Sequence, residues 1–189
     1  MRGFEFIHGT IRDWEERFAS ILAQQLRAKR KGKLGKIWFV DETYIRVKGK
    51  WCYLYRAIDE NGNLVDVRLS EKRGMEAAKA FFAQAREVAE QSPQRVVTGG
   101  LVSYPRAIDE ELETDVEHEV RGCLRNPIEQ SHRGIKQRYY AMLGFGAMES
   151  AKRFCQGIDE VQQFLRPRER IIELVSLLSV AESKYDLFP

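Results

Sequence analysis

Ile37-Trp-Phe-Val-Asp-Glu-Thr-Tyr-Ile-Arg-Val47 is the stretch of sequence that decides the fold. Aromatic and β-branched residues dominate it and no Gly or Pro interrupts it, so it predicts a strand. Alternate residues of a strand share a face, which places Asp41 in the middle of the more apolar side. A carboxylate there is costly unless it is paired or binds a metal ion. The strand alone leaves both interpretations open: an Asp satisfied by a nearby Arg or backbone amide, or a metal ligand.

The totals for the whole chain indicate a folded domain. Of the 189 residues, 43% are hydrophobic and 31% are charged, which predicts one domain with a real core. No apolar run approaches the roughly 20 residues needed to span a bilayer, and the N-terminus has no apolar signal core. We therefore expect a cytoplasmic protein without a membrane partner. Three widely spaced cysteines argue against both a disulfide framework and a zinc ribbon.

The charge distribution is more informative than the net charge of +3. No acidic residue lies between Arg27 and Lys36, a stretch that carries six cations. Both a solvated linker and a phosphate-contacting arm explain such a block. The candidate DNA-binding residues in it are Arg27, Lys29, Arg30, Lys31, Lys33 and Lys36.

The rest of the chain predicts an ordered series of elements. Strands are expected at 51–58 and 64–69, joined through an Asn-Gly hairpin signal, and with the first strand they form an antiparallel meander. Helical spacing then covers 75–89, followed by a short strand at 95–98, a helix at 103–112 and a strand at 116–120. This β-β-β-α-β-α-β-α order is the plan of the ribonuclease-H-like fold: a mixed five-stranded sheet, three strands antiparallel and two parallel, with helices on both faces.

A further helix has a well-specified start at Asn126-Pro-Ile-Glu129, with an N-cap, a proline and a glutamate in the expected places. Its position alone favours Glu129 as a capping residue of this helix. Four side chains at helical spacing share one face of this helix: Glu129, His132, Arg133 and Lys136. An amphipathic helix follows at 151–165, and an apolar stripe near the N-terminus predicts another, built from Trp14, Phe18, Ile21, Leu22 and Leu26.

Two long blocks resemble small bacterial insertion-sequence transposases. Residues 38–59 are similar to the first catalytic strand and hairpin of that group, and residues 126–138 to its third catalytic block. Ser103-Tyr-Pro-Arg-Ala-Ile108 and Met142-Leu-Gly-Phe145 resemble it too. Over residues 3–168 the chain is identified as a member of the insertion-sequence-six (IS-six) family, whose members carry a DDE integrase-type domain.

The resemblance implies a metal-dependent reaction on DNA. In the family, two aspartates and a glutamate hold two Mg²⁺ (or Mn²⁺) ions for cleavage and transfer of DNA strands. Carried over to this chain, the catalytic and metal-binding residues are Asp41 and Glu129. The same resemblance implies that His132, Arg133 and Lys136 contact phosphate.

This sequence departs from the family pattern in two places. The second aspartate of the family follows the short fourth strand, where this chain has Gly99. We therefore expect weakened metal binding and impaired catalysis. Only the end of the family's helix-turn-helix region is recognisable. The expected domains are a remnant of that region (1–26), a basic linker (27–36), the catalytic domain (37–168) and a helical tail (169–189).

The sequence thus predicts a shortened, impaired transposase. Its expected partners are DNA, both transposon ends and target, and further copies in a homodimer or higher oligomer associated with the nucleoid. The alternative is a non-catalytic DNA-binding or dominant-negative protein that dimerises with intact transposase. A third interpretation is an interaction module of the same fold with no DNA role.

Overall fold

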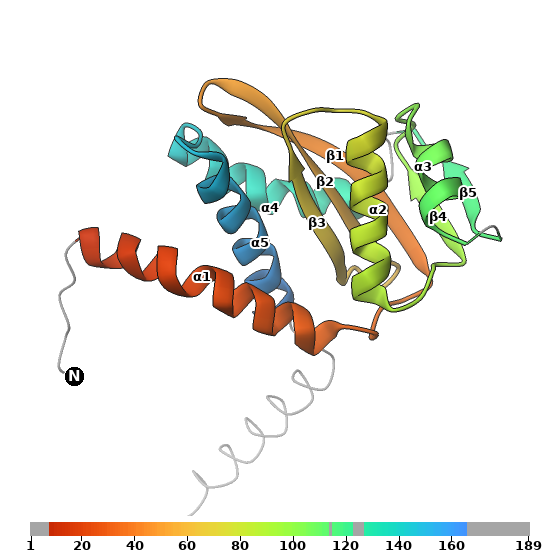
Figure 1. Cartoon of the computed structure of the whole chain (residues 1–189), viewed down its shortest axis with the longest axis horizontal. Coiled ribbons are helices and arrows are strands. Elements are labelled where there is room, and N and C mark those ends of the chain that lie inside the picture. The colour runs from red at the N-terminus through yellow and green to blue at the C-terminus, as the bar shows by residue number, and fades with distance from the viewer. Residues whose placement is uncertain (1–7, 114, 123–126, 166–189) are drawn as a thin grey trace, which may run out of the picture.

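The computed structural model describes residues 8–113, 115–122 and 127–165, and in these ranges the strands form one mixed sheet (Figure 1). The spatial order is β3-β2-β1-β4-β5. β1 pairs antiparallel with β2 and β2 antiparallel with β3, whereas the β1–β4 and β4–β5 pairs are parallel. This topology confirms the predicted ribonuclease-H-like sheet. The strands are β1 (Ile37–Val47), β2 (Lys50–Asp59), β3 (Leu64–Ser70), β4 (Arg95–Thr98) and β5 (Glu117–Val120).

Helices cover both faces of this sheet, as predicted (Figure 1). α2 and α3 pack on one face, and α4 and α5 pack on the other. α1 lies along α5 and makes most of its contacts with that helix. The helices are α1 (His8–Arg30), α2 (Met75–Ala89), α3 (Tyr104–Glu111), α4 (Pro127–Met142) and α5 (Met148–Leu165).

The alternation along β1 divides its side chains between two apolar cores. Trp38 and Val40 enter the core beneath α2 and α3, where rings from the helices and β2 pack closely. Ile45 and Val47 enter the second core, beneath α4 and α5. Asp41 has the same parity as Ile45, so it lies on the sheet face that α4 and α5 cover. The strand and helix that carry the expected ligands therefore share one face of the sheet.

α1 differs from the expected N-terminal organisation. It continues to Arg30, so the predicted basic linker begins inside a helix. The buried side chains of Ala23 and Leu26 stabilise this extension, and a left-handed Gly32 with a φ of 68° follows the helix end. Three members of the predicted apolar stripe are exposed instead of packed: Phe18, Ile21 and Leu22.

Some predicted features lie outside the described residues. These are the tail at 169–189 and the segment that precedes α1. The helix-turn-helix remnant at 1–26 therefore stays a prediction, of which the structure describes the helix α1. Within the described ranges, no helix combines the length and apolar character needed to cross a membrane.

Candidate active site beside Asp41

Asp41 lies where two parallel strands separate. β1 and β4 pair from Ile37 with Arg95 to Val40 with Thr98, and Asp41 and Gly99 are the next residue on each strand. A Cβ atom built on Gly99 would lie 2.9 Å from Oδ1 of Asp41. The position that the resemblance assigns to the second aspartate is therefore next to the first. The carboxyl ends of parallel strands are a common place for a binding site.

A cavity of about 470 Å³ opens beside Asp41, between β1 and α4. β1 contributes Asp41 and the three residues that follow it to the lining, and α4 contributes polar and cationic residues. The cavity thus joins the first and third blocks that the sequence singled out. Its lining residues are Asp41, Glu42, Thr43, Tyr44, His132, Arg133, Lys136, Gln137 and Tyr140.

Glu129 lies in the first turn of α4, but its side chain is outside the described part of the structure. Its backbone position places it one turn before His132, on the helix that lines the cavity. The structure therefore brings the helix of Glu129 to the strand of Asp41. The approach of the Glu129 carboxylate to that of Asp41 stays a prediction.

The three expected phosphate contacts of α4 differ in character. Arg133 is exposed and Lys136 is half-buried, so both can present charge to the cavity. His132 is only 5% exposed, and burial together with the nearby Arg56 and Lys136 lowers its pKa to about 3. The imidazole is thus neutral at pH 7, and Arg133 and Lys136 supply the positive charge on this face of α4.

An ion pair not foreseen from the sequence lies next to Asp41. Arg56 stands directly opposite Asp41 in the β1–β2 register, on the same face of the sheet. Its guanidinium binds Asp159 of α5 in a bidentate manner, with Nε donating at 3.0 Å and Nη2 at 2.7 Å. Both side chains are buried, at 5% and 0% exposure. The guanidinium of Arg56 therefore has a buried carboxylate partner on α5.

On the opposite face, Glu42 anchors the segment that follows Gly99. The buried Tyr104 hydroxyl donates to Oε2 of Glu42 at 2.7 Å, and Arg73 pairs with the same carboxylate. Burial and the negative charge of Glu42 raise the pKa of Tyr104 well above its usual value. Because Tyr104 begins α3, this bond ties the start of that helix to β1 beside the candidate site.

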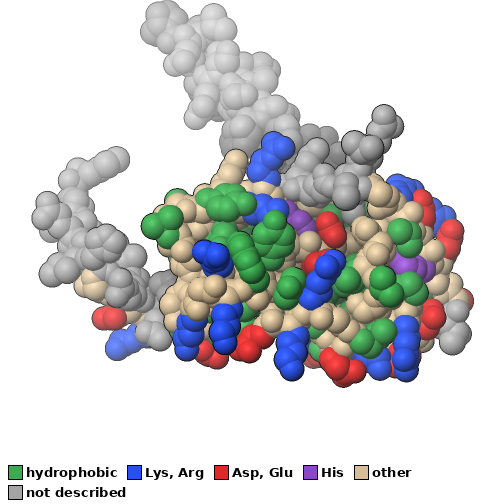
Figure 2. Space-filling view, turned by 90° about the horizontal axis from the view of Figure 1, so that it is seen from above, with side chains coloured by type: hydrophobic (Ala, Val, Ile, Leu, Met, Phe, Trp, Pro, Cys, Tyr) green, Lys and Arg blue, Asp and Glu red, His purple; other side chains and the backbone are tan. Residues whose placement is uncertain are grey.

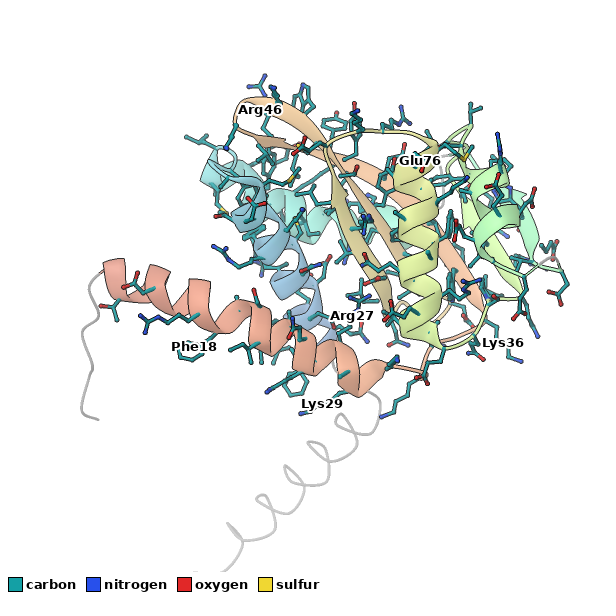
Figure 3. The ribbon with its side chains drawn as sticks, in the orientation of Figure 1. Phe18, Arg27, Lys29, Lys36, Arg46 and Glu76 are labelled. Carbon is teal, nitrogen blue, oxygen red and sulfur yellow. The ribbon has the colours of Figure 1, made fainter. Side chains whose placement is uncertain are left out.

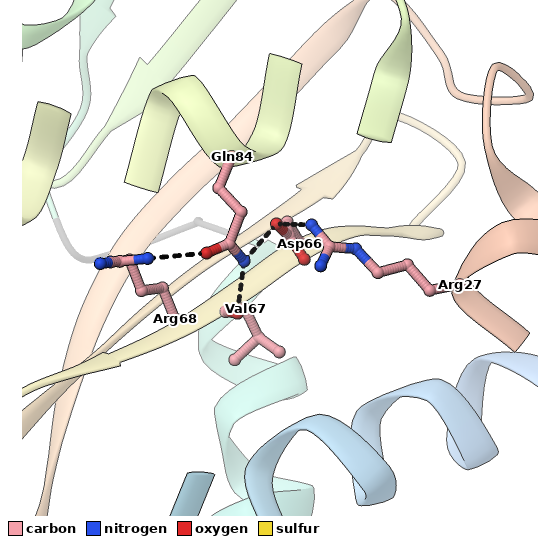
Figure 4. Close-up of polar contacts among 5 residues, drawn as sticks. All are labelled: Arg27, Asp66, Val67, Arg68 and Gln84. Atoms are coloured by element: carbon pink, nitrogen blue, oxygen red, sulfur yellow. Dashed lines mark hydrogen bonds and ion pairs between the residues drawn. The ribbon is translucent and has the colours of Figure 1, made fainter. Parts of the chain in front are cut away.

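The basic stretch at 27–36 is less free for DNA than its composition suggests. Arg27 points from α1 toward the sheet, whereas Lys29 and Lys36 are exposed (Figure 3). The Nη2 atom of Arg27 donates to Asp66 at 2.9 Å, and Gln84 of α2 donates to the same carboxylate at 2.7 Å (Figure 4). Asp66 is buried, so this network holds Arg27 in the packing of α1, and its contact with phosphate stays a prediction.

The other cations of this stretch vary in their surroundings. Lys31 pairs with Glu90 at 3.2 Å on the surface, and the ammonium group of Lys33 donates to the backbone oxygen of Lys29. The side chain of Arg30 lies outside the described residues. Exposed pairs of this kind are weak, so Lys29, Lys31, Lys33 and Lys36 stay candidates for phosphate contact.

Among the described residues that line the cavity, Asp41 and Glu42 carry the carboxylates. Among the described side chains, no three His, Cys, Asp or Glu residues are grouped so that they could hold a metal ion. Mg²⁺ prefers carboxylate oxygens and water, and Asp41 supplies the carboxylate that suits it. Gly99 supplies no side-chain oxygen, so the described residues match only part of the ligand set that the family uses for its two metal ions.

The fold and this site together define a ribonuclease-H-like domain with a carboxylate at the point where its parallel strands part. The DDE domain family matches residues 35–168. The chain belongs to the DDE transposases of insertion sequences, within the IS-six group.

Two relatives illustrate this membership. The transposase for the insertion sequence-like element IS431mec of Staphylococcus aureus is 34% identical over 180 residues, which cover 92% of this chain and 77% of that protein. The transposase for element IS257 in transposon Tn4003 of Staphylococcus aureus gives the same values, 34% identity over 92% and 77% of the two chains.

Solved structures share the fold at low sequence identity. The catalytic core domain of BIV integrase is 13% identical, with a TM-score of 0.51 over 80% of this chain and 99% of that one. A chain of the simian T-cell lymphotropic virus intasome in complex with the PP2A regulatory subunit B56 gamma is 16% identical, with a TM-score of 0.50 over 74% and 58% of the two chains.

Proposed function

We propose that the Asp41 cavity is the DDE site at which this chain engages DNA, and that Gly99 leaves it impaired for strand cleavage and transfer. The observation that carries the proposal is the 2.9 Å between a Cβ placed on Gly99 and Oδ1 of Asp41. An aspartate at position 99 would bring a second carboxylate against the first. Glycine brings none, so the site has lost an oxygen ligand at the position next to Asp41.

The backbone at position 99 does not itself demand glycine. Its φ lies outside the left-handed region in which side chains are strained. A new side chain would approach the end of the Asp41 carboxylate, which can rotate away, and not a fixed backbone atom. The glycine is therefore better explained as a lost ligand than as a structural requirement.

In the proposed mechanism, Asp41 and Glu129 would hold Mg²⁺ or Mn²⁺, and the missing side-chain ligand at Gly99 would weaken that binding. Such an ion, when bound, supplies electrophilic stabilisation of a phosphodiester under in-line attack. Arg133 and Lys136 neutralise phosphate charge at the mouth of the cavity. Neutral His132 lines the same cavity and adds no charge. The DNA engaged comprises transposon ends and target in the bacterial cytoplasm, and the active form is a homodimer or higher oligomer.

A strand-cleavage assay tests this proposal. Supercoiled plasmid that carries the terminal repeats of an IS-six element is incubated with Mg²⁺ or Mn²⁺ and each protein. We expect little nicking by the unmodified chain and at least tenfold more by Gly99→Asp, because the added carboxylate completes the ligand set. Asp41→Asn combined with Gly99→Asp is the matched control and should be inactive. Robust nicking by the unmodified chain would refute the impairment.

A second candidate function follows from the same glycine. A chain with an intact DDE fold and a defective ligand set can bind DNA or intact transposase without cleaving, and so act in a dominant-negative manner. Co-purification with an intact IS-six transposase, followed by loss of nicking as this chain is added, would support that role. Unchanged nicking at a large excess of this chain would exclude it.

A further inference from the structure

A cluster of exposed rings and cations lies at the end of the β1–β2 hairpin, next to the Asp41 cavity. Figure 2 views the molecule from the hairpin side and shows hydrophobic side chains bordered there by Lys and Arg. We call this cluster the hairpin platform. Its members are Tyr44, Arg46 and Trp51 from the hairpin, and Lys136 and Tyr140 from α4.

The platform is continuous from the hairpin to the helix. The guanidinium carbon of Arg46 lies 4.9 Å from the centre of the Trp51 ring. The rings of Trp51 and Tyr44 meet edge to face, with centroids 4.9 Å apart. The ammonium nitrogen of Lys136 then lies 5.8 Å from the centre of the Tyr44 ring. Cations and rings therefore alternate along one surface, in contacts that are individually favourable.

The strand pairing explains why this surface is open. β4 pairs with β1 only as far as Val40, so the β1 edge beyond Asp41 is not covered by β4. α4 crosses there instead, which lets Tyr44 reach the cavity lining. Tyr44 is 55% exposed, Trp51 48% and Tyr140 64%. Large exposed rings gathered in this way mark a binding surface more often than a chance arrangement.

The charges of the platform indicate an anionic partner. Among the described residues, neither Arg46 nor Lys136 forms an ion pair with an acidic side chain. Arg133, which lines the adjoining cavity, forms no ion pair with a described acidic side chain either. A second copy of this chain would bring the same positive charge against it. Alternating cations and exposed rings suit single-stranded nucleic acid, whose phosphates and base faces are both accessible.

We propose that the hairpin platform binds unpaired bases of single-stranded DNA and leads that strand into the Asp41 cavity. This inference rests on the proposed function, because it assigns the strand that the same cavity receives. Bases stack on Tyr44 and Trp51, and phosphates contact Arg46 and Lys136. A paired duplex hides its base faces and offers only phosphates, so it would use the cations without the rings. Tyr44, Lys136 and Tyr140 also line the cavity, which makes the two surfaces continuous.

Trp51 provides a direct probe of this binding. Oligothymidylate of about 12 nucleotides, within the range of single-strand site sizes, is titrated into the protein with EDTA present. Trp51 is 48% exposed and Trp38 is 1% exposed, so stacking should quench the emission of Trp51 and not that of Trp38. The Trp51→Phe variant separates the Trp51 signal from the emission of Trp14. We expect the single strand to bind about tenfold more tightly than a duplex of equal phosphate number, given the strength of base stacking. Trp51→Phe should keep binding within about twofold and lose the quenching.

Anisotropy of a labelled oligothymidylate measures the variants. Trp51→Ala and Tyr44→Ala should each weaken binding about tenfold. Phe18→Ala is the matched control, because it removes an equally exposed ring, 57% exposed, on α1. It should leave binding unchanged.

Three results would overturn the proposal. The first is unaltered affinity in both ring variants, and the second is tighter binding of duplex than of single strand. The third is self-association of the protein that the ring variants abolish, because this would identify a second copy as the partner. The assay contains no metal and measures no cleavage. Failure of Gly99→Asp to restore nicking would therefore leave the platform result standing, and the reverse also holds.

Discussion

Removing one partner of the buried ion pair between Arg56 and Asp159 should destabilise this domain strongly. Asp159→Asn keeps the side-chain shape and removes its charge. Arg56 is 4% exposed, so its guanidinium would lose its carboxylate where water cannot replace it. Removing one partner of such a pair costs about 3–5 kcal/mol. Domains are stable by only about 5–15 kcal/mol, so the variant should unfold at a much lower urea concentration.

Two further variants separate the pair from its surroundings. Arg56→Met combined with Asp159→Leu removes both charges and should recover most of the lost stability, because neither charge is then buried alone. Glu117→Gln serves as the control, because it breaks an exposed ion pair with Arg95. The side chain of Arg95 is 39% exposed and that of Glu117 is 63% exposed. This control should change the free energy of unfolding by no more than about 0.5 kcal/mol. The reasoning is refuted if Asp159→Asn costs less than about 1 kcal/mol, the range of exposed pairs.

The remaining predictions concern His132, Lys136 and Arg27. His132 has a pKa of about 3 in the folded chain and about 6.5 unfolded, so the unfolded state binds the extra proton between these values. Stability should therefore fall below pH 6.5, by about 2 kcal/mol at pH 5; His132→Gln should flatten that part of the urea-unfolding profile, and parallel profiles would contradict the assignment. Lys136→Ala should reduce the slope of log affinity for DNA against log salt by about 1, and an unchanged slope would exclude a phosphate contact. Arg27→Ala should instead lower the unfolding midpoint and leave the salt dependence of DNA affinity unaltered, because Asp66 already binds its guanidinium. A weaker salt dependence in this variant would show that Arg27 contacts phosphate.

The strands and their pairing could be predicted because their signals are local. β1 was expected at 37–47 and lies at Ile37–Val47, since alternation and β-branched residues mark both of its ends. The Asn61-Gly62 turn fixes the β2–β3 hairpin, and Gly62 adopts the expected left-handed conformation with a φ of 72°. The parallel pairing of β4 followed from a crossover helix between it and the meander.

The side-chain partners at the candidate site could not be predicted, because they join distant parts of the chain. Arg56 and Asp159 lie 103 residues apart, and no periodicity signals that they meet. Arg56 stands at an inward position of an apolar strand, which was the only available sign that it needed a buried partner. The burial of His132 was hidden for a similar reason, because helical spacing shows which residues share a face and not how deeply that face is covered.

The position of Gly99 illustrates the opposite case. The family pattern places its second aspartate after the short fourth strand, where this chain has Gly99. The parallel register of β1 and β4 gives that position a place next to Asp41. The role of Glu129 depends on a side chain outside the described structure and stays a prediction.

Thermal unfolding of Gly99→Asp with and without Mg²⁺ tests the central claim most directly. Two carboxylates about 4 Å apart repel by as much as about 4 kcal/mol at an effective dielectric of 20, so the metal-free variant should melt below the unmodified chain. Mg²⁺ at about 100 times its dissociation constant stabilises by about 2.7 kcal/mol, which corresponds to roughly 5–10 °C for a chain of this size. We predict that rise for Gly99→Asp, little change for the unmodified chain, and little for the uncharged Gly99→Asn control. An equal rise in all three proteins, or none in Gly99→Asp, would contradict the assignment of position 99 as the missing metal ligand beside Asp41.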